Sequence, residues 1–116
     1  MSNFNVLLHL AKNEEWDHVM NMIGHLKASP EGEWNIVVMI TGSASLSCLN
    51  YSKLDELKAG IDKYSEKNVH FKVCCKNLLK YGIAQEWVYP KIQITNDAAV
   101  IEIARLLDEG YKYIKI

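Results

Sequence analysis

Apolar residues along this chain alternate between short continuous runs and stretches with helical spacing. The two clearest runs are residues 5–10 and 34–40, which are apolar on both alternations and therefore predict strands covered on both faces. Further strands are predicted at residues 69–73, 91–94 and 111–116. The fourth strand is expected near a sheet edge, and the last, which alternates cleanly, is expected to be half-exposed.

Helical spacing fills the intervals between these runs. The first predicted helix begins at residues 13–15 and ends before Pro30, because proline disfavours helical geometry in the preceding residue. The second begins at the N-cap Ser52, and another follows Asn96 or Asp97 as its cap. The apolar face of the first helix consists of Trp16, Val19, Met20, Ile23 and Leu26, and that of the second consists of Leu54, Leu57, Ile61 and Tyr64. In the last helix the apolar face consists of Val100, Ile103, Ala104 and Leu107. Gly110 is expected at the C′ position of this last helix.

A further short helix is predicted directly after the third strand, at residues 77–79. Residues 83–90 fit neither pattern, although Trp87, Val88 and Tyr89 are expected to cover the core. Strands and helices thus alternate in the order βαβαβαβαβ, which predicts a largely parallel sheet between two helical layers. We expect a single doubly wound α/β domain over residues 1–116, with about five mostly parallel strands.

Composition and charge exclude several classes of protein. Hydrophobic residues make up 49% of the chain and charged residues 23%, values typical of an ordinary globular protein. The net charge is −1 and the basic residues are scattered, so no field draws in nucleic acid or an anionic membrane. We expect no secretory leader, because residues 1–4 do not show a charged and then apolar pattern, and no apolar run approaches the roughly 20 residues of a membrane span. We expect a cytoplasmic protein whose three cysteines are reduced, without a nucleic-acid or membrane partner.

The segment 68–82 carries the strongest chemical signal. Its strand runs into Cys74 and Cys75 and then directly into a helix, so a thiol is expected at the carboxyl edge of the sheet and beside a helix N-terminus. Both features favour a thiolate. The alternative is that Cys74 is a small buried hydrophobe, as free cysteines often are. If Cys74 ends an extended strand, Cys75 points to the opposite side and is expected to be structural.

The spacing around these cysteines, and short segments elsewhere, carry a family resemblance. The residues concerned are Val69, Phe71, Cys74, Leu78, Gly82 and Ile83, together with residues 6–10, Trp16, 37–38, Gly42 and 110–115. In this respect the chain resembles the small DsrE/DsrF-like proteins, which include sulfur-relay sulfurtransferase subunits. The resemblance implies a three-layer α/β/α fold, a homo-oligomer that is trimeric or hexameric, and Cys74 rather than Cys75 as the carrier of persulfide sulfur.

Two positions depart from the pattern of that family. The loop after the second strand often reads His-Gly-x-Gly, whereas residues 41–44 read Thr-Gly-Ser-Ala. The chain also ends on Ile116, where proline is common. The leading hypothesis is a DsrE-like sulfurtransferase or sulfur carrier, without a cofactor, that relays sulfane sulfur on Cys74 from a donor protein or small thiol. The alternative is a non-enzymatic, oligomeric subunit of the same fold that binds a small molecule or a partner.

Other polar residues are candidates for the surroundings of the thiol. The predicted pocket residues are His9, Gly42, Ser43, Lys76 and Asn77. His9 could shuttle a proton there, or it could be satisfied within the core or an oligomer contact. Cys48 is either a resolving thiol at the same edge or core filler. The other histidines are expected to be exposed or at an interface; these are His18, His25 and His70.

Several rival chemistries fail on spacing. The cysteines are adjacent rather than in a CxxC pair, and no histidine and cysteine share the spacing of a zinc site. A phosphatase loop requires arginine six positions after its nucleophile, where this chain has Lys80. No P-loop or GxGxxG motif is present. The final strand either packs on one face of the sheet or pairs across a subunit interface, and we prefer the subunit interface. The residues concerned are Tyr111, Tyr113, Ile114 and Ile116.

Overall fold

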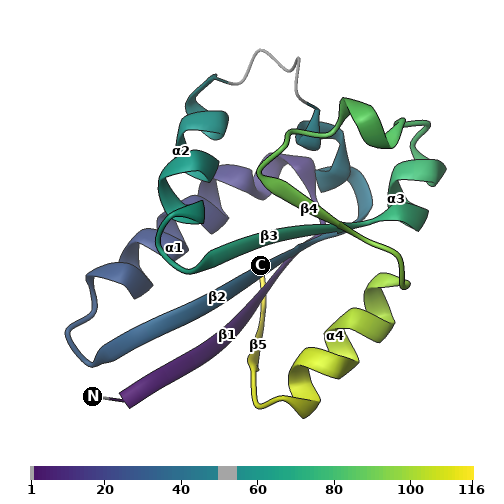
Figure 1. The fold of residues 1–116 in the computed structure, drawn as a ribbon. Coiled ribbons are helices and arrows are strands. Elements are labelled where there is room, and N and C mark those ends of the chain that lie inside the picture. Colours follow the sequence, from purple (N-terminus) through teal and green to yellow (C-terminus); the bar gives the residue numbers. More distant parts are fainter. Residues whose placement is uncertain (1, 50–54) are drawn as a thin grey trace.

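The structure, a computed structural model, describes residues 2–49 and 55–116. It contains a five-stranded, all-parallel sheet in the order β4-β3-β2-β1-β5 (Figure 1). The strands are β1 (Ser2–Leu10), β2 (Gly32–Ile40), β3 (Val69–Cys74), β4 (Ile92–Thr95) and β5 (Lys112–Lys115). The helices are α1 (Trp16–Ala28), α2 (Asp55–Ser65), α3 (Cys75–Lys80) and α4 (Ala99–Asp108), with short 3-10 helices η1 (Asn13–Glu15), η2 (Gly42–Cys48) and η3 (Gln85–Trp87). The predicted doubly wound α/β fold is confirmed, whereas the predicted Ser52 cap and Leu54 lie outside the described residues.

The sheet separates two hydrophobic clusters of different size. The main core lies between the sheet and helices α1 and α2, and its largest fully buried side chains include Phe71 of β3 and Leu8 of β1. The predicted apolar face of α1 is confirmed by the burial of Trp16, Val19 and Ile23. A smaller cluster lies on the opposite face beneath α4, and its buried members are Leu7, Val37, Met39, Cys74 and Leu106. The main core therefore uses two helices, whereas the cluster that contains Cys74 uses one.

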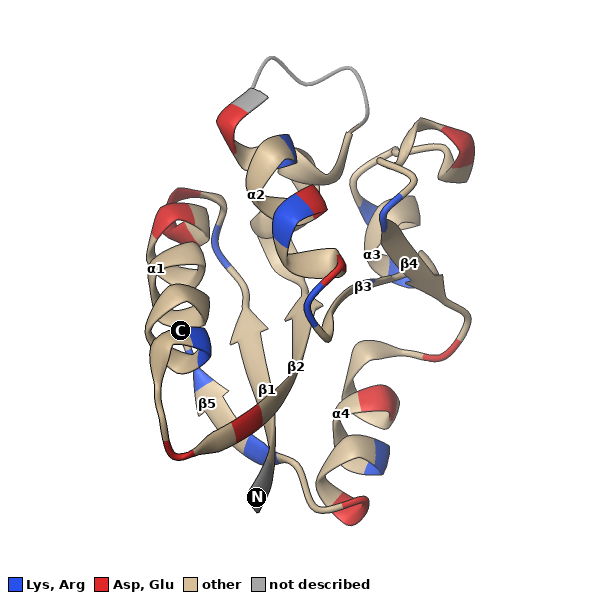
Figure 2. Ribbon diagram, turned by 60° about the vertical axis from the view of Figure 1, so that its left-hand side comes forward, with Lys and Arg blue, Asp and Glu red and all other residues tan. Residues whose placement is uncertain are grey.

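Among the described residues, α4 is the helix that covers the second face of the sheet. It connects β4 at one edge to β5 at the other, and it lies apart from α1 and α2 in both ribbon views (Figures 1 and 2). The helix has only 10 residues. In the strip of sheet formed by β1 and β5, Leu7 of β1 is buried beneath the helix, whereas its partner Tyr113 of β5 is 43% exposed.

The orientation of α4 differs from the prediction. Residues that share its apolar stripe were expected to face the core, yet Val100 is 71% exposed and Leu107 is 44% exposed. The most buried positions of the helix are Glu102 and Leu106. The reason is an ion pair, since Glu102 meets Lys72 of β3 and this turns the charged side of the helix toward the sheet.

Two other local predictions are wrong. The N-cap of α4 is Ala98, without a side-chain cap, because the Asp97 carboxylate instead accepts a hydrogen bond from Arg105. Trp87 is 45% exposed, because its neighbour Val88 bridges to Leu49 and points inward, which leaves the preceding side chain facing outward.

The predicted end of α4 at Gly110 is confirmed. This residue has φ +98°, a conformation that glycine adopts without strain. Its N–H donates to the carbonyl of Leu107, and the N–H of Tyr111 donates to the carbonyl of Leu106. This pair of bonds is a Schellman motif, which leads the chain from α4 directly into β5.

Candidate functional site

Cys74 ends β3 and caps α3. Its Sγ accepts the backbone N–H of Asn77 at 3.4 Å and the side-chain Nδ2–H of the same residue at 3.4 Å. The side-chain Oδ1 of Asn77 in turn accepts the N–H of Gly42 at 3.4 Å. Because α3 has only 6 residues, these directed donors, rather than a long helix dipole, are the main polar feature that the sulfur meets. Asn77 therefore binds the thiol to the loop that follows β2.

The thiol itself is buried. Cys74 is 1% exposed and packs in the cluster beneath α4 with Leu7, Val37 and Met39. It lies on the opposite face of the sheet from Val73, which belongs to the main core. In this arrangement no molecule in solution reaches the sulfur without a displacement of the groups above it.

Cys75 has a different environment. It is partly exposed and belongs to neither hydrophobic cluster. Its Sγ–H donates to the carbonyl of Asn96 at 3.5 Å. This single weak bond ties the start of α3 to the chain after β4.

A groove of about 500 Å³ lies beside this buried thiol. The wall formed by α4 is apolar and consists of Ala99, Val100, Ile103 and Leu107. The facing wall is polar and consists of His9, Thr41, Asn77 and Tyr113. Asn77 thus has two roles, since it lines the groove and also donates to Sγ of Cys74.

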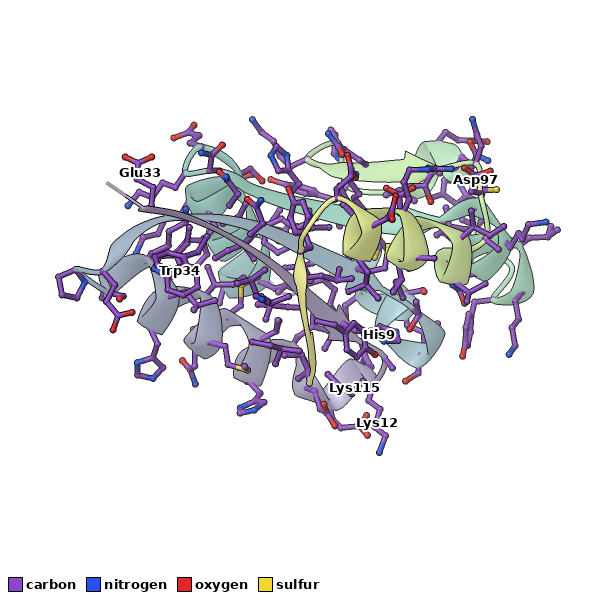
Figure 3. The ribbon with its side chains drawn as sticks, turned by 90° about the horizontal axis from the view of Figure 1, so that it is seen from below. His9, Lys12, Glu33, Trp34, Asp97 and Lys115 are labelled. Atoms are coloured by element: carbon purple, nitrogen blue, oxygen red, sulfur yellow. The ribbon has the colours of Figure 1, made fainter. Side chains whose placement is uncertain are left out.

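His9 joins two of the polar groups in this wall. Its Nδ1 lies 2.6 Å from the Tyr113 hydroxyl, and its Nε2 lies 2.8 Å from Oγ1 of Thr41. Burial, together with the nearby charge of Lys115, lowers the pKa of His9 below 6.5. Figure 3 shows His9 and Lys115 close together at one end of the sheet. At neutral pH the imidazole is therefore uncharged, with one nitrogen as donor and the other as acceptor between two hydroxyls.

Gly42 is required by the turn that follows β2. Its φ is +55°, and a Cβ at this position would lie 2.6 Å from the carbonyl oxygen of Ala11. A side chain here would push the loop away from β1 and move the N–H that Asn77 accepts. The glycine therefore sets the position of the polar wall, although its own atoms do not line the groove.

The remaining predicted site residues lie elsewhere. Ser43 accepts a hydrogen bond from the N–H of Asn13 and does not line the groove. Lys76 is exposed on α3 and does not line it either. Cys48 is fully buried in the main core, on the other face of the sheet from Cys74, and burial raises its pKa to about 12. It is core filler and not a second thiol beside Cys74.

Two polar groove residues, Tyr113 and Thr41, were not predicted from the sequence as site residues, and neither were the four residues of the apolar wall. Tyr113 reaches the groove because β5 pairs with β1 in a register that aligns it with Leu7. The sequence offered alternation in the last strand, but nothing in that pattern names the neighbouring strand. The signal for Thr41 was stronger, since it begins the small-residue loop at the end of β2.

An ion-pair network holds α4 above Cys74. The Nζ of Lys72 lies 3.1 Å from Oε1 of Glu102, and Nη1 of Arg105 lies 2.8 Å from its Oε2. Arg105 also reaches Asp97 through Nη2 at 2.8 Å. The Glu102 side chain is only 9% exposed. The helix that covers the thiol is thus attached to the sheet by buried charge as well as by Leu106.

Basic and acidic residues are interspersed along the ribbon (Figure 2). The three remaining histidines, His18, His25 and His70, are exposed, as predicted. In the part of the chain that the structure describes, no group of three or more His, Cys, Asp or Glu could hold a metal ion. Nor does any helix there have the length and apolar character to cross a membrane.

Comparison with known proteins identifies the fold. No family profile matches the chain, and no curated protein matches its sequence at a significant level. Several solved structures match the chain, and two of them are similar to it over nearly its whole length. MTH1491 of Methanobacterium thermoautotrophicum, a protein of unknown function, has a TM-score of 0.85 and 17% identity over 97% of this chain and 99% of that one. The ychN protein of E. coli has a TM-score of 0.70 and 13% identity over 97% of this chain and 100% of that one.

Both of these proteins have DsrE/DsrF-like folds. This chain has the DsrE/DsrF-like fold. The fold expected from the residues around Cys74 is thereby confirmed. At identities this low, the similarity of the DsrE/DsrF-like structures extends to the arrangement of the strands and helices and not to their chemistry.

Proposed function

We propose that this protein is a cytoplasmic DsrE/DsrF-like protein that binds or relays sulfane sulfur on Cys74. The observation that supports the proposal most strongly is the pair of N–H groups from Asn77 that meet Sγ. Hydrogen bonds to an ionised acceptor are stronger than bonds to a neutral one, so both donors would stabilise negative charge on this sulfur during the transfer. The same residue lines the groove, which gives a donor molecule a place beside the thiol.

The transfer step conserves atoms and electrons. The Cys74 thiolate attacks the outer sulfur of a donor persulfide, R–S–S–H, so that a new S–S bond forms on Cys74 and the S–S bond of the donor breaks. The donor leaves as the thiol R–S–H with the original proton, and Cys74 carries the persulfide anion. The acceptor, a protein or small-molecule thiolate, takes the sulfur by the same attack in the next step.

Access to the sulfur depends on the groups that cover it. Because Cys74 is 1% exposed, loading requires displacement of the Asn77 side chain or of α4. The Asn77 side chain is the smaller barrier, since it is held by two long hydrogen bonds of 3.4 Å. We assign this side chain as the barrier between the groove and the thiol.

Intact mass after incubation with a persulfide donor tests the proposal. The wild type and the matched control Cys75→Ser should each gain one sulfur atom that a reductant removes, whereas Cys74→Ser should gain none. Serine differs from cysteine in one atom, so the buried site is expected to stay folded. Uptake of sulfane sulfur by the double variant Cys74→Ser, Cys75→Ser, or no uptake by Cys75→Ser, would rule the proposal out.

A second candidate function is a non-enzymatic subunit that binds a small molecule or a partner. The burial of Cys74 favours it, because a thiol packed among Leu7, Val37 and Met39 also serves as an ordinary core residue. The two functions differ in one result. Occupation of the groove without any sulfur adduct in the wild type would select the binding subunit.

Assembly into a trimer or hexamer is part of the proposal. Ile101 of α4 supports it, since this apolar side chain is 51% exposed and does not line the groove. The final strand supports it less than its sequence suggested, because Ile114 and Ile116 pack against the main core. Its Tyr111 packs against the smaller cluster.

Mass photometry at micromolar concentration measures this assembly. Ile101→Lys should shift the protein toward monomer, because it places a charge in the apolar surface. Leu79→Lys is the matched control, since Leu79 is 82% exposed on α3, away from this surface. A wild type that is monomeric at this concentration would exclude the oligomer.

A further inference from the structure

The groove beside Cys74 combines an apolar wall with uncharged hydrogen-bonding groups. Its volume of about 500 Å³ falls within the range of roughly 300 to 1,000 Å³ that is typical of small-molecule sites. Among the described residues, no lysine, arginine, aspartate or glutamate lines it. These properties restrict the chemistry of a molecule that fits.

The apolar wall follows from the ion pair beneath α4. Because Glu102 is held against Lys72, the apolar stripe of the helix turns sideways, toward the strip of sheet formed by β1 and β5. Ile103 stays in contact with the smaller cluster, while Val100 and Leu107 extend over the groove. A ligand placed here covers apolar surface that the fold leaves exposed.

The polar wall offers few and specific partners. His9 lies between Tyr113 and Thr41, so each of these three groups has a defined hydrogen-bond neighbour. Lys72 and Arg105 are paired with Glu102, and Lys115, which lies beside His9, is exposed at the end of β5, where water screens its charge. A ligand with a full charge would therefore lose water in exchange for at most a screened attraction.

We propose that this groove binds an uncharged organic molecule with an apolar body and a single hydrogen-bonding end. The body lies against α4, and the polar end lies between Asn77 and the His9–Thr41 pair. In sulfur relay this ligand is an uncharged organic thiol, or its persulfide, with its sulfur directed toward Asn77 and Cys74. The identification of the ligand as a thiol or persulfide rests on the proposed function. The binding of an uncharged organic molecule in the groove does not depend on that function.

Titration of the isotope-labelled full chain, followed by amide chemical shifts, tests this inference. Phenethyl alcohol should produce saturable shifts at groove residues such as Thr41, Ala99 and Ile103. Phenylacetate and phenethylammonium have similar bodies and opposite charges, and both should bind at least about tenfold more weakly. Equal binding of a charged probe, or shifts confined to other parts of the molecule, would overturn the inference.

Two variants of α4 form a matched pair for the same titration. Val100→Glu places a carboxylate in the groove and should weaken phenethyl alcohol at least about tenfold, whereas Ile101→Glu should leave binding unchanged. Both positions are more than half exposed, so both variants are expected to fold. Equal effects of the two substitutions would contradict the site.

The result also separates this inference from sulfur relay. Cys74→Ser should still bind phenethyl alcohol, because the thiol is not part of the groove lining. A sulfur adduct on Cys74 without binding of phenethyl alcohol would overturn the inference and leave the proposed function intact. Binding of phenethyl alcohol without a sulfur adduct would support the inference and overturn sulfur relay. If shifts appear only after dilution to monomer, a second copy of the chain fills the groove and the inference is wrong.

Discussion

Replacement of Glu102 by glutamine removes the negative charge that Lys72 and Arg105 share beneath α4. The side chains of Glu102 and Lys72 are 9% and 21% exposed, and their charged atoms are 3.1 Å apart. Exposed ion pairs contribute about 0 to 1 kcal/mol, whereas loss of one partner from a buried pair costs about 3 to 5 kcal/mol. A partly buried pair lies between these limits. We therefore expect Glu102→Gln to lower the free energy of unfolding by about 2 kcal/mol.

Two measurements follow from this value. Reversible urea unfolding should report the loss directly, and Tm should fall by roughly 8 °C in a domain of this size. Because α4 covers Cys74, local opening of the helix should become easier by a similar free energy. In a Cys75→Ser background, alkylation of Cys74 should then be faster by about ten- to thirtyfold.

A control defines the contribution of the pair. Lys72→Met leaves Glu102 bonded to Arg105, so its cost should be smaller, about 1 kcal/mol, and the double variant should cost less than the sum of the two. Stability within about 0.5 kcal/mol of the wild type, together with an unchanged alkylation rate, would refute the idea that buried charge holds α4 over the thiol.

Three further outcomes are expected. Asn77→Ala, in the same background, should speed alkylation of Cys74 and lower stability by about 1 kcal/mol, and an unchanged rate would show that Asn77 is not the barrier. Cys48, whose pKa burial raises to about 12, should react with iodoacetamide only when the whole chain unfolds, so labelling of the folded protein at pH 8 would be inconsistent with the core. The pKa of His9 is lowered on folding, so the unfolded state binds more protons as pH falls below 6.5, and urea unfolding should show stability declining there. His9→Asn should reduce this decline, and an equal decline in the variant would contradict the assignment.

The strands were predictable because burial on both faces leaves a strong signal. Residues 34–40 are apolar at every alternation apart from one polar position, and the corresponding strand is buried between α4 and the α1 and α2 layer. Cys74 was predictable as a strand end for a similar reason, since the alternation of Val69, Phe71 and Val73 assigns the cysteine to the other face.

The rotation of α4 was not predictable from its own residues. An apolar stripe normally faces the core, and only the strand order reveals that Lys72 lies beneath the helix. The hydrogen bond between His9 and Tyr113 has the same origin, because it depends on β5 pairing with β1 across 104 positions of sequence. Burial of Cys74 was not predictable for the same reason, since it depends on which helix crosses the second face of the sheet.

Site-resolved detection of sulfane sulfur tests the central claim most directly. The Cys75→Ser protein would be incubated with an organic persulfide, alkylated, digested and analysed by mass spectrometry of the peptide that contains Cys74. We predict one additional sulfur on Cys74, lost on reduction, with loading that is faster in Asn77→Ala. Sulfur on Cys48 with an unmodified Cys74, or no additional sulfur on any peptide in the presence of excess donor, would contradict the claim that Cys74 carries sulfane sulfur.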